Sequence, residues 1–402
     1  MFADTRDDII KIDHRSNQYF RFTCMLIFTC FFLPGLSQDS ELKIALFYDS
    51  PVQTIIFSPE KGDYFLNKGL NTETIISRNE VIYISLMGDS LAVRGLNSFY
   101  GYFKKIKFLP DSSGNIFSLR PVHPKDDKRS YRGALSMAAE FMRVMAINHV
   151  HIDDYLSGVV LSEAGGGATL EFYKAQAILC RTYTMANLER HGGEGFNLCD
   201  GVHCQAYKQQ NGISPLIDQA IKETGDEVVV HEDTFLITAA FHANCGGQTQ
   251  NAEREWLSHE PYLREVVDPY CKNGRNRTWK KTIPLHDWKS YLLTNGFSSS
   301  NVSHPGNMIC KIDRRKDYYQ IGASKISYRK IRTDWFLKSS FFSVNIDRNN
   351  DIVLQGHGYG HGIGMCQEGG MNMGRLGFNY HQILNFYFRG INIVSYSAIS
   401  KF

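Results

Sequence analysis

The sequence predicts a mixed α+β fold rather than a doubly wound sheet. Residues 41–150 contain short runs of β-branched and aromatic residues separated by turn-forming residues, a pattern typical of strands. Near residue 155 the apolar period changes to helical spacing, and strand-like runs return from residue 227. Because strands and helices do not alternate regularly, a parallel βαβ architecture is not expected.

The N-terminal strands are predicted from five runs, each bounded by Gly, Asn, Asp or Pro. Such runs suit a sheet, because β-branched and aromatic side chains pack well on a pleated surface. The runs are LKIALFYD, QTIIFSP, VIYISLM, IKFLP and AINHVHI.

A helix is predicted to begin after Thr169. The threonine side chain can accept a hydrogen bond from a free backbone N–H of the first turn, where the helix dipole also favours the carboxylate of Glu171. Apolar residues then recur at helical spacing. They are Phe172, Ala175, Leu179, Tyr183 and Ala186.

The later segments mix loops, strands and helices. Residues 190–210 are predicted to form a loop rich in Gly, Cys and His, and the polar residues 270–305 a surface insertion. Strands are predicted at 227–231, 235–242, 341–346 and 352–354, and helices at 364–377 and 379–388.

Composition and charge narrow the functional class. The chain has 402 residues, of which 43% are hydrophobic and 21% are charged, as in ordinary globular proteins. The formal net charge of +3 is small, whereas binding to phosphate backbones requires concentrated positive charge. We therefore expect no nucleic-acid partner.

The N-terminus is predicted to be an export signal. The segment Phe22–Leu36 carries no charge and follows Arg21; it is short for a membrane span and suits the apolar part of a signal peptide. Residues 1–38 are therefore predicted to be a signal peptide, with a retained N-terminal membrane anchor as the alternative. Cys24 and Cys30 lie within this segment. The chain has nine cysteines, so seven remain after this segment is removed. Because seven is an odd number, they cannot all form disulfides within the chain.

Glu163 is a candidate catalytic acid, because it precedes a run of three glycines in LSEAGGG. Cleavage of a glycosidic bond requires a proton for the leaving oxygen. A carboxylic acid whose pKa is raised by burial can donate that proton. The alternative is a loop or capping residue with no chemical role.

Two histidines and two cysteines lie close together within residues 190–207. Imidazole and thiolate groups are ligands that tetrahedral zinc favours, although the spacing is not that of a common zinc finger. A disulfide between Cys199 and Cys204, or four unrelated loop residues, are the alternatives. The candidate ligands are His191, Cys199, His203 and Cys204.

The segment FHANCGGQT, residues 241–249, raises the possibility of a thiol nucleophile. A reactive Cys245 would need a base such as His242 close by. Residues three apart along a strand point to opposite faces, which argues against this pair.

Glycine occupies every second position from 356 to 364. On a strand, this pattern would remove the side chains from one face, so that a sugar ring or another backbone could lie against it near His357 and His361. Tight packing with two hydrogen-bonded histidines is the alternative. Cys366 is not expected to be a nucleophile.

Taken in order, these segments resemble the stage II sporulation protein D family, which includes the amidase enhancers. The resemblance covers residues 41–396, and a domain of this type is expected at 39–396, with a β-rich part at 41–150 and a catalytic part at 151–396. The motifs are YRGALSM (131–137), KAQAILCRTY (174–183), CDGVHCQAY (199–207), FHANCGGQT (241–249) and GHGYGHGIGMCQEGG (356–370).

The resemblance implies helices flanking a catalytic groove and a lytic transglycosylase. Such an enzyme cleaves the bond between N-acetylmuramic acid and N-acetylglucosamine in glycan strands stripped of peptides, and leaves 1,6-anhydro ends. The resemblance assigns the role of catalytic acid to Glu163. The family usually has Met-Pro after this acid, whereas this chain has Ala164 and Gly165, which loosens the turn that orients Glu163.

The resemblance also implies a structural zinc at His191, Cys199, His203 and Cys204, because four protein ligands leave no open position. No organic cofactor is expected. Arg181 is assigned to substrate contact with the lactyl carboxylate of the glycan. The residues expected to line the groove are Arg181, Gln205, Tyr207, His242, His357 and His361.

Peptidoglycan glycan strands are the expected partner, together with an N-acetylmuramoyl-L-alanine amidase. The expected location is outside the cytoplasm, in the periplasm or at the cell surface. A non-catalytic, glycan-binding enhancer of a cell-wall amidase is the main competing function. Zinc amidase or peptidase chemistry is a third reading, and it would require an open position on the metal.

Overall fold

The computed structural model describes residues 41–69, 73–208, 212–232, 235–256 and 258–399. The predicted signal peptide, residues 1–38, lies outside the described residues. Among the described residues, no helix combines the length and the apolar character that a membrane crossing needs.

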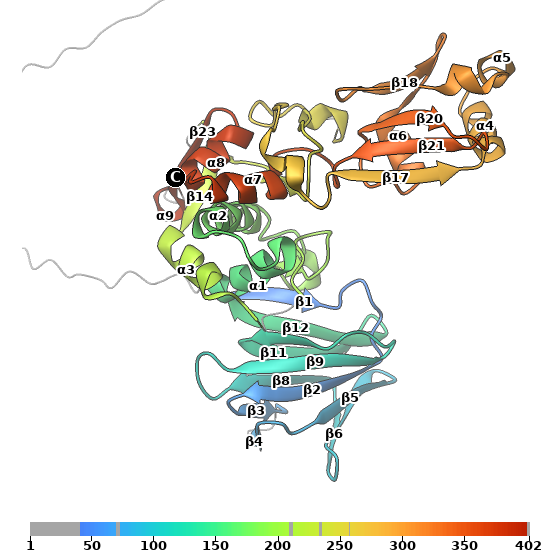
Figure 1. Ribbon diagram of the computed structural model, residues 1–402. Helices are drawn as coiled ribbons and strands as arrows, with labels where there is room; N and C mark the ends of the chain where they lie inside the picture. The colour runs from blue at the N-terminus through green and yellow to red at the C-terminus, as the bar shows by residue number, and fades with distance from the viewer. Residues whose placement is uncertain (1–40, 70–72, 209–211, 233–234, 257, 400–402) are drawn as a thin grey trace, which may run out of the picture. The chain divides into compact units, whose positions relative to one another are not determined.

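The predicted mixed α+β class is confirmed, and the N-terminal part is rich in strands (Figure 1). One sheet has the order β13-β1-β12-β11-β8-β3-β4 and the other β10-β9-β2-β5-β6-β7. Their strands are β1 (Glu41–Leu46), β2 (Thr54–Lys61), β3 (Tyr64–Asn67), β4 (Glu73–Ile76), β5 (Ile82–Met87), β6 (Ser90–Arg94), β7 (Phe99–Phe103), β8 (Lys105–Pro110), β9 (Ile116–His123), β10 (Arg129–Arg132), β11 (Ala134–Glu140), β12 (Arg143–His151) and β13 (Leu198–Cys199).

Alternating burial explains why these segments form two facing sheets. Along β8, Lys105 and Lys107 are exposed while Ile106 and Phe108 are buried, the period of a strand with one face in the core. Phe108 stacks on Phe57 of β2, in the other sheet, with 3.8 Å between ring centroids. The hydrophobic core of this part therefore lies between the two sheets.

Two consecutive helices follow the sheets and position the candidate acid. Helix α1 (Ile152–Ala164) was not predicted; its residues from Tyr155 to Leu161 are all buried, so it shows no amphipathic period. Helix α2 (Leu170–Ala186) begins as predicted, since the Thr169 hydroxyl accepts a hydrogen bond from the N–H of Phe172 at 3.4 Å. The two helices pack against each other.

The C-terminal elements largely follow the predicted order. The predicted strand at 235–242 is divided into two short strands, and the two predicted C-terminal helices are present. These elements are α3 (Pro215–Thr224), β14 (Glu227–His231), β15 (Phe235–Leu236), β16 (Phe241–His242), η3 (Tyr270–Asn273), β22 (Met365–Cys366), α7 (Gln367–Arg375), α8 (Tyr380–Tyr387), β23 (Ile391–Ser395) and α9 (Tyr396–Ile399).

The segment predicted as a polar surface insertion contributes to a second hydrophobic core. Buried side chains from Ile283 to Leu354 form one cluster around Trp288. The predicted strands at 341–346 and 352–354 belong to this cluster. Its elements are β17 (Thr278–Ile283), α4 (Leu285–Thr294), α5 (Ser299–Val302), β18 (Tyr318–Ile321), β19 (Ser324–Ser327), α6 (Tyr328–Asp334), β20 (Phe342–Ile346) and β21 (Ile352–His357).

The glycine-rich segment forms a loop for most of its length. Strand β21 ends at His357, and the glycines at 358, 360, 362 and 364 all have positive φ. A Cβ atom on Gly364 would lie 2.2 Å from the backbone oxygen of Ala240. The expected glycine-lined strand face is therefore wrong beyond His357, and the glycines instead allow another backbone segment, residues 240–246, to approach closely.

Candidate functional site

A groove with a volume of about 490 Å³ contains Glu163. This volume lies within the range of ordinary ligand sites. The groove is bounded by the turn between α1 and α2, the η3 region and helix α7. Its lining residues are Glu163, Ala164, Gly165, Gly166, Gly167, Ala243, Tyr270, Asn273, Gly274, Arg275, Asn276, Gln367, Glu368, Met371, Asn372 and Arg375.

Glu163 lies in the last turn of α1, and hydrogen bonds fix both its backbone and its carboxyl group. Gly165 has a φ of 71° and ends the helix, with its N–H donating to the backbone oxygen of Leu161. The N–H of Ala206 donates to Glu163 Oε1 at 2.7 Å. Gln367 Nε2 donates to the backbone oxygen of Glu163 at 3.1 Å. Ala164 and Gly165, which replace the Met-Pro usual in the family, therefore form the end of helix α1.

The carboxyl group of Glu163 is held in an environment that favours its protonated form. Burial raises its pKa above the ordinary 4.5, and this effect exceeds the opposing effects of the Ala206 N–H and the Lys208 ammonium group. A raised pKa with the carboxyl group in a groove is the property that a general acid requires.

Several groove residues were not singled out by sequence reasoning. Arg275 and Arg375 bring two exposed guanidinium groups to the groove. Glu368 accepts hydrogen bonds from Asn244 Nδ2 at 2.6 Å and from Asn276 Nδ2 at 2.7 Å. Glu368 lies inside the motif at 356–370, but nothing in that motif indicates that its carboxylate, rather than a histidine, faces the groove.

The other carboxylate near Glu163 in sequence has a structural role. Glu171 forms an ion pair with Lys174 at 3.0 Å and accepts a hydrogen bond from the N–H of Tyr380 at 2.9 Å. It ties the start of α2 to the start of α8 and does not line the groove.

Arg181 does not line the groove, so its predicted contact with substrate is wrong. The side chain is buried, and its guanidinium group donates to Thr224 Oγ1 and to the backbone oxygens of Ile221 and Glu227 at 3.1 to 3.4 Å. Helix α2 is buried on nearly all sides. The hydrogen bonds of Arg181 connect this helix to the end of α3 and the start of β14.

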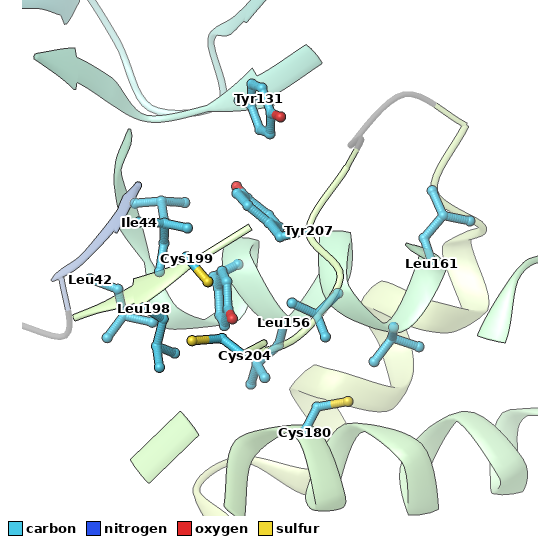
Figure 2. Packing of buried hydrophobic residues seen from close by; sticks show 14 of the residues in the cluster. Leu42, Ile44, Tyr131, Leu156, Leu161, Cys180, Leu198, Cys199, Cys204 and Tyr207 are labelled. Carbon is cyan, nitrogen blue, oxygen red and sulfur yellow. The ribbon is translucent and has the colours of Figure 1, made fainter. Parts of the chain in front are cut away.

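Gln205 and Tyr207 are likewise core residues, and the prediction that they line the groove is wrong. The amide of Gln205 bonds to the Thr184 hydroxyl and the backbone oxygen of Cys180. Tyr207 is fully buried, and its hydroxyl donates to Asn148 Oδ1 at 3.0 Å. Figure 2 shows the Tyr207 ring among buried side chains, pointing toward Tyr131. The N–H of the neighbouring Ala206, by contrast, donates to the carboxyl group of Glu163.

The three histidines predicted to line the groove, His242, His357 and His361, are not among the residues that line this one. His361 donates through Nε2 to the backbone oxygen of Phe241 and accepts at Nδ1 from the N–H of Ile363, both at 3.0 Å. Burial lowers the pKa of His361 to about 4 and that of His242 well below its usual value. His357 packs against the ring of Phe341. The alternative of tight packing with a hydrogen-bonded histidine fits His361.

The four predicted zinc ligands do converge, and they are called the His–Cys cluster: His191, Cys199, His203 and Cys204. Their ligand atoms all lie within 4.8 Å of one another. Cys204 Sγ is 3.5 Å from His191 Nε2 and 3.6 Å from His203 Nδ1, and Cys199 Sγ is 3.8 Å from His203 Nδ1. Tetrahedral zinc, bonded at about 2.3 Å to sulfur and about 2.0 Å to nitrogen, would hold these atoms about 3.5 Å apart. Figure 2 shows both cysteines among the buried residues of a hydrophobic cluster.

Neighbouring groups support this cluster as a ligand set. His191 Nδ1 bonds to Glu194 at 2.7 Å, and Glu194 also accepts a hydrogen bond from the Tyr48 hydroxyl. Such outer partners fix the tautomer of a metal-binding imidazole. A hydrogen bond from the Cys204 thiol lowers the pKa of Cys199 to about 5. Every cysteine in the described ranges is a free thiol. The residues therefore fit a tetrahedral zinc.

Sequence comparisons place these features in a known group of proteins. A family model described as "Stage II sporulation protein" matches residues 141–231, which include α1, Glu163 and the His–Cys cluster. An uncharacterized protein of Brachyspira hyodysenteriae is 28% identical over 275 residues, covering 67% of this chain and 74% of that protein.

Two relatives from Bacillus subtilis carry descriptive names. The stage II sporulation protein D is 28% identical over 270 residues, covering 62% of this chain and 76% of that protein. The amidase enhancer is 26% identical over 294 residues, covering 60% of this chain but only 40% of that longer protein. The family-model match and these named relatives together support the assignment of this chain to the stage II sporulation protein D family.

Proposed function

We propose that this protein is a lytic transglycosylase of the cell wall. Its substrate would be peptidoglycan glycan strands stripped of peptides, cleaved between N-acetylmuramic acid and N-acetylglucosamine. The family match and the relatives named for sporulation and amidase enhancement support a cell-wall-related role. The observation that carries the specific chemistry is the partly buried carboxyl group of Glu163, with a raised pKa, in a groove.

One carboxyl group is sufficient for this reaction. The protonated Glu163 donates its proton to the glycosidic oxygen, and the bond from that oxygen to C1 of the muramic residue breaks. The carboxylate then removes the proton from the 6-hydroxyl of the same residue, whose oxygen bonds to C1 and closes the 1,6-anhydro ring. Atoms and protons balance, and no water is consumed, whereas ordinary glycosidases use two carboxyl groups to activate water.

The arginines of the groove suit a glycan without peptides. Removal of the stem peptide leaves a free lactyl carboxylate on each muramic residue, and guanidinium groups bind carboxylates through paired hydrogen bonds. Arg275 and Arg375 line the same groove as Glu163. We assign to them the role that sequence reasoning gave to Arg181.

Glu368 is the second carboxylate of the groove, and it defines a competing reaction. A second carboxylate that activates water would make the enzyme a hydrolase with ordinary reducing ends as products. The asparagine donors around Glu368 occupy much of its accepting capacity, which favours a role in ordering the groove wall. The product end distinguishes the two reactions.

We also propose a structural zinc at the His–Cys cluster, held by His191, Cys199, His203 and Cys204. Four protein ligands leave no position for water, so the ion would stabilise the chain ahead of Ala206, whose N–H holds Glu163. The same saturation argues against zinc amidase or peptidase chemistry.

The proposed setting is outside the cytoplasm, in the periplasm or at the cell surface. An amidase that removes stem peptides would supply the substrate, and the relative named an amidase enhancer is consistent with such a partner. A glycan-binding enhancer without catalytic activity is the second candidate function.

The test is digestion of purified, peptide-free glycan strands, with the products identified by mass spectrometry. The wild-type protein should release fragments with 1,6-anhydro ends, one water lighter than hydrolysis products. Glu163→Gln should reduce the rate by about 10²- to 10⁴-fold, the usual contribution of a general acid, because an amide cannot donate this proton. Circular dichroism would check that the variant is folded.

Glu171→Gln is the matched control, because this carboxylate lies outside the groove; it should keep most of the activity. Reducing ends would indicate a hydrolase instead. Strands that bind but remain uncut, with wild type and variant alike, would leave the enhancer role in place of the enzyme.

A further inference from the structure

A second group of metal-ligating side chains converges inside the protein and shares no member with the His–Cys cluster. All its members are buried, and their ligand atoms lie within 4.8 Å of one another. They come from the segment after β16, from the η3 region and from the junction of β22 and α7, up to 121 residues apart in sequence. We call them the Cys3Asp cluster: Cys245, Asp268, Cys271 and Cys366.

The distances within the Cys3Asp cluster fit a tetrahedral ion. Cys245 Sγ lies 3.5 Å from Cys271 Sγ and 3.2 Å from Asp268 Oδ2. Zinc bonded at about 2.3 Å to sulfur and about 2.0 Å to oxygen places two sulfurs about 3.8 Å apart, and a sulfur and an oxygen about 3.5 Å apart. The cluster would need to expand by only a few tenths of an ångström to surround the ion.

The charge balance of the Cys3Asp cluster also favours a cation. Three thiols and a carboxyl group are buried together, and ionised groups in an apolar interior are costly unless they are paired or bind a metal. The guanidinium group of Arg315 donates to the backbone oxygen of Cys245 at 2.8 Å, not to its sulfur. The sulfur atom instead contacts Asp268 and Cys271 within the cluster. A divalent cation would displace the thiol protons and offset the negative charge.

Hydrogen-bond donors outside the cluster already orient its ligands. The backbone N–H groups of Cys245 and Gly369 point at Cys366 Sγ at 3.2 and 3.4 Å. The Tyr387 hydroxyl donates to Asp268 Oδ2 at 3.0 Å. Donors to thiolate sulfur and to ligand carboxylates are typical of built metal sites, where they fix the ligand geometry.

We infer that the Cys3Asp cluster binds one structural zinc ion, in addition to the ion proposed at the His–Cys cluster. Three thiolates and one carboxylate form a soft, tetrahedral ligand set that suits zinc. Four protein ligands and complete burial leave no position for substrate or water, so the ion has no direct catalytic role.

The position of this ion in the fold suggests what it stabilises. Cys271 lies in η3 beside the groove residue Asn273, and Cys366 is the N-cap of α7, which carries the groove residue Glu368. Cys245 lies two residues beyond Ala243, another groove residue. A zinc ion would therefore join three chain segments that line the groove.

Metal content of the full-length chain, purified without chelators and measured by plasma mass spectrometry, tests this inference. The double variant Cys271→Ser/Cys366→Ser should contain one zinc equivalent fewer than the wild-type protein. Cys199→Ser/Cys204→Ser should lose the other equivalent, and Cys310→Ser, outside both clusters, should lose none. Unchanged zinc in the Cys271→Ser/Cys366→Ser variant, or iron at this site in the wild type, would overturn the assignment.

A measurement on the wild-type protein avoids dependence on the folding of a variant. The chain is unfolded in chelator without reductant, alkylated and digested, and its cysteine peptides are identified. Alkylated Cys245, Cys271 and Cys366 are expected, because zinc keeps thiols reduced. A disulfide between Cys245 and Cys271 would exclude the metal site. Neither readout depends on glycan cleavage, so this inference and the proposed activity can fail separately.

Discussion

At the scale of single residues, the environment of Glu163 differs from that of the charged groups around it. The Glu163 carboxyl group receives one hydrogen bond from a backbone N–H, and burial outweighs this bond in setting its pKa. Arg275 and Arg375 line the groove, but no ion pair joins either of them to Glu163 among the described residues. The raised pKa of Glu163 is therefore compatible with the proposed binding of an anionic glycan by the two arginines.

The groove arginines give a prediction about substrate binding. Arg275→Gln and Arg375→Gln should each weaken binding of peptide-free glycan by about tenfold, since a hydrogen bond to a charged group contributes about 1.5–3 kcal/mol. The loss should shrink as salt is added, because both side chains are exposed. Calorimetry would measure it, with Arg348→Gln, an exposed arginine outside the groove, as the control. Equal affinity for all three variants would contradict the assignment.

The sequence brought Glu163 and the four His–Cys residues to attention, and the structure places Glu163 in the groove and the four side chains together. The sequence could not select the rest of the groove. Arg181, Gln205 and Tyr207 stand in the most recognisable motifs, but their side chains are buried and bond to the core. A motif shows that a residue type is needed; it does not show which way the side chain points.

At the scale of secondary structure elements, the loop that follows β21 shows how close packing determines the path of the chain. Its alternating glycines suggested a strand, whereas their positive φ values make a loop that lies against residues 240–246. Helix α1 was missed for a related reason. Its buried residues run consecutively, so the period that reveals an amphipathic helix is absent. Helix α2, with a threonine cap and spaced apolar residues, was predictable.

Substitution of two glycines separates the effect of close packing from that of backbone conformation. Gly377→Ala should cost about 1–2 kcal/mol, because φ is +89° there but no atom lies near the added Cβ. Gly364→Ala should cost more, because φ is +69° and the added Cβ would lie 2.2 Å from the backbone oxygen of Ala240. Urea unfolding would compare them. Equal losses would show that the approach of the two backbones is not tight.

At the scale of the whole chain, the described residues form two hydrophobic clusters. The larger one includes the sheets, the helix that carries Glu163, and Cys199 and Cys204 of the His–Cys cluster. The smaller one lies within residues 283–354. The composition of residues 270–305 suggested only a surface insertion, because the apolar residues that complete the smaller cluster are supplied by segments further along the chain. Contacts such as that between Arg315 and the backbone of Cys245 connect the two.

Removal of the largest side chain of the smaller cluster tests whether it is a separate unit of stability. Trp288→Ala should remove about 3–5 kcal/mol, as expected for a buried tryptophan. Amide hydrogen exchange should accelerate in peptides from 278–354 and stay unchanged in the sheets of residues 41–151. Trp256→Ala, at a 39% exposed position, should have little effect on either region. Uniform acceleration along the chain would indicate one cooperative unit.

The raised pKa of the groove carboxyl group can be measured directly. Carbon-13 NMR of the protein labelled at glutamate carboxyl carbons would follow the titration of Glu163, identified as the resonance that Glu163→Gln removes. Because burial disfavours the carboxylate, we predict a midpoint above the ordinary 4.5, so that the protonated acid persists to higher pH. A midpoint at or below 4.5 would leave the proposed bond cleavage without its proton donor.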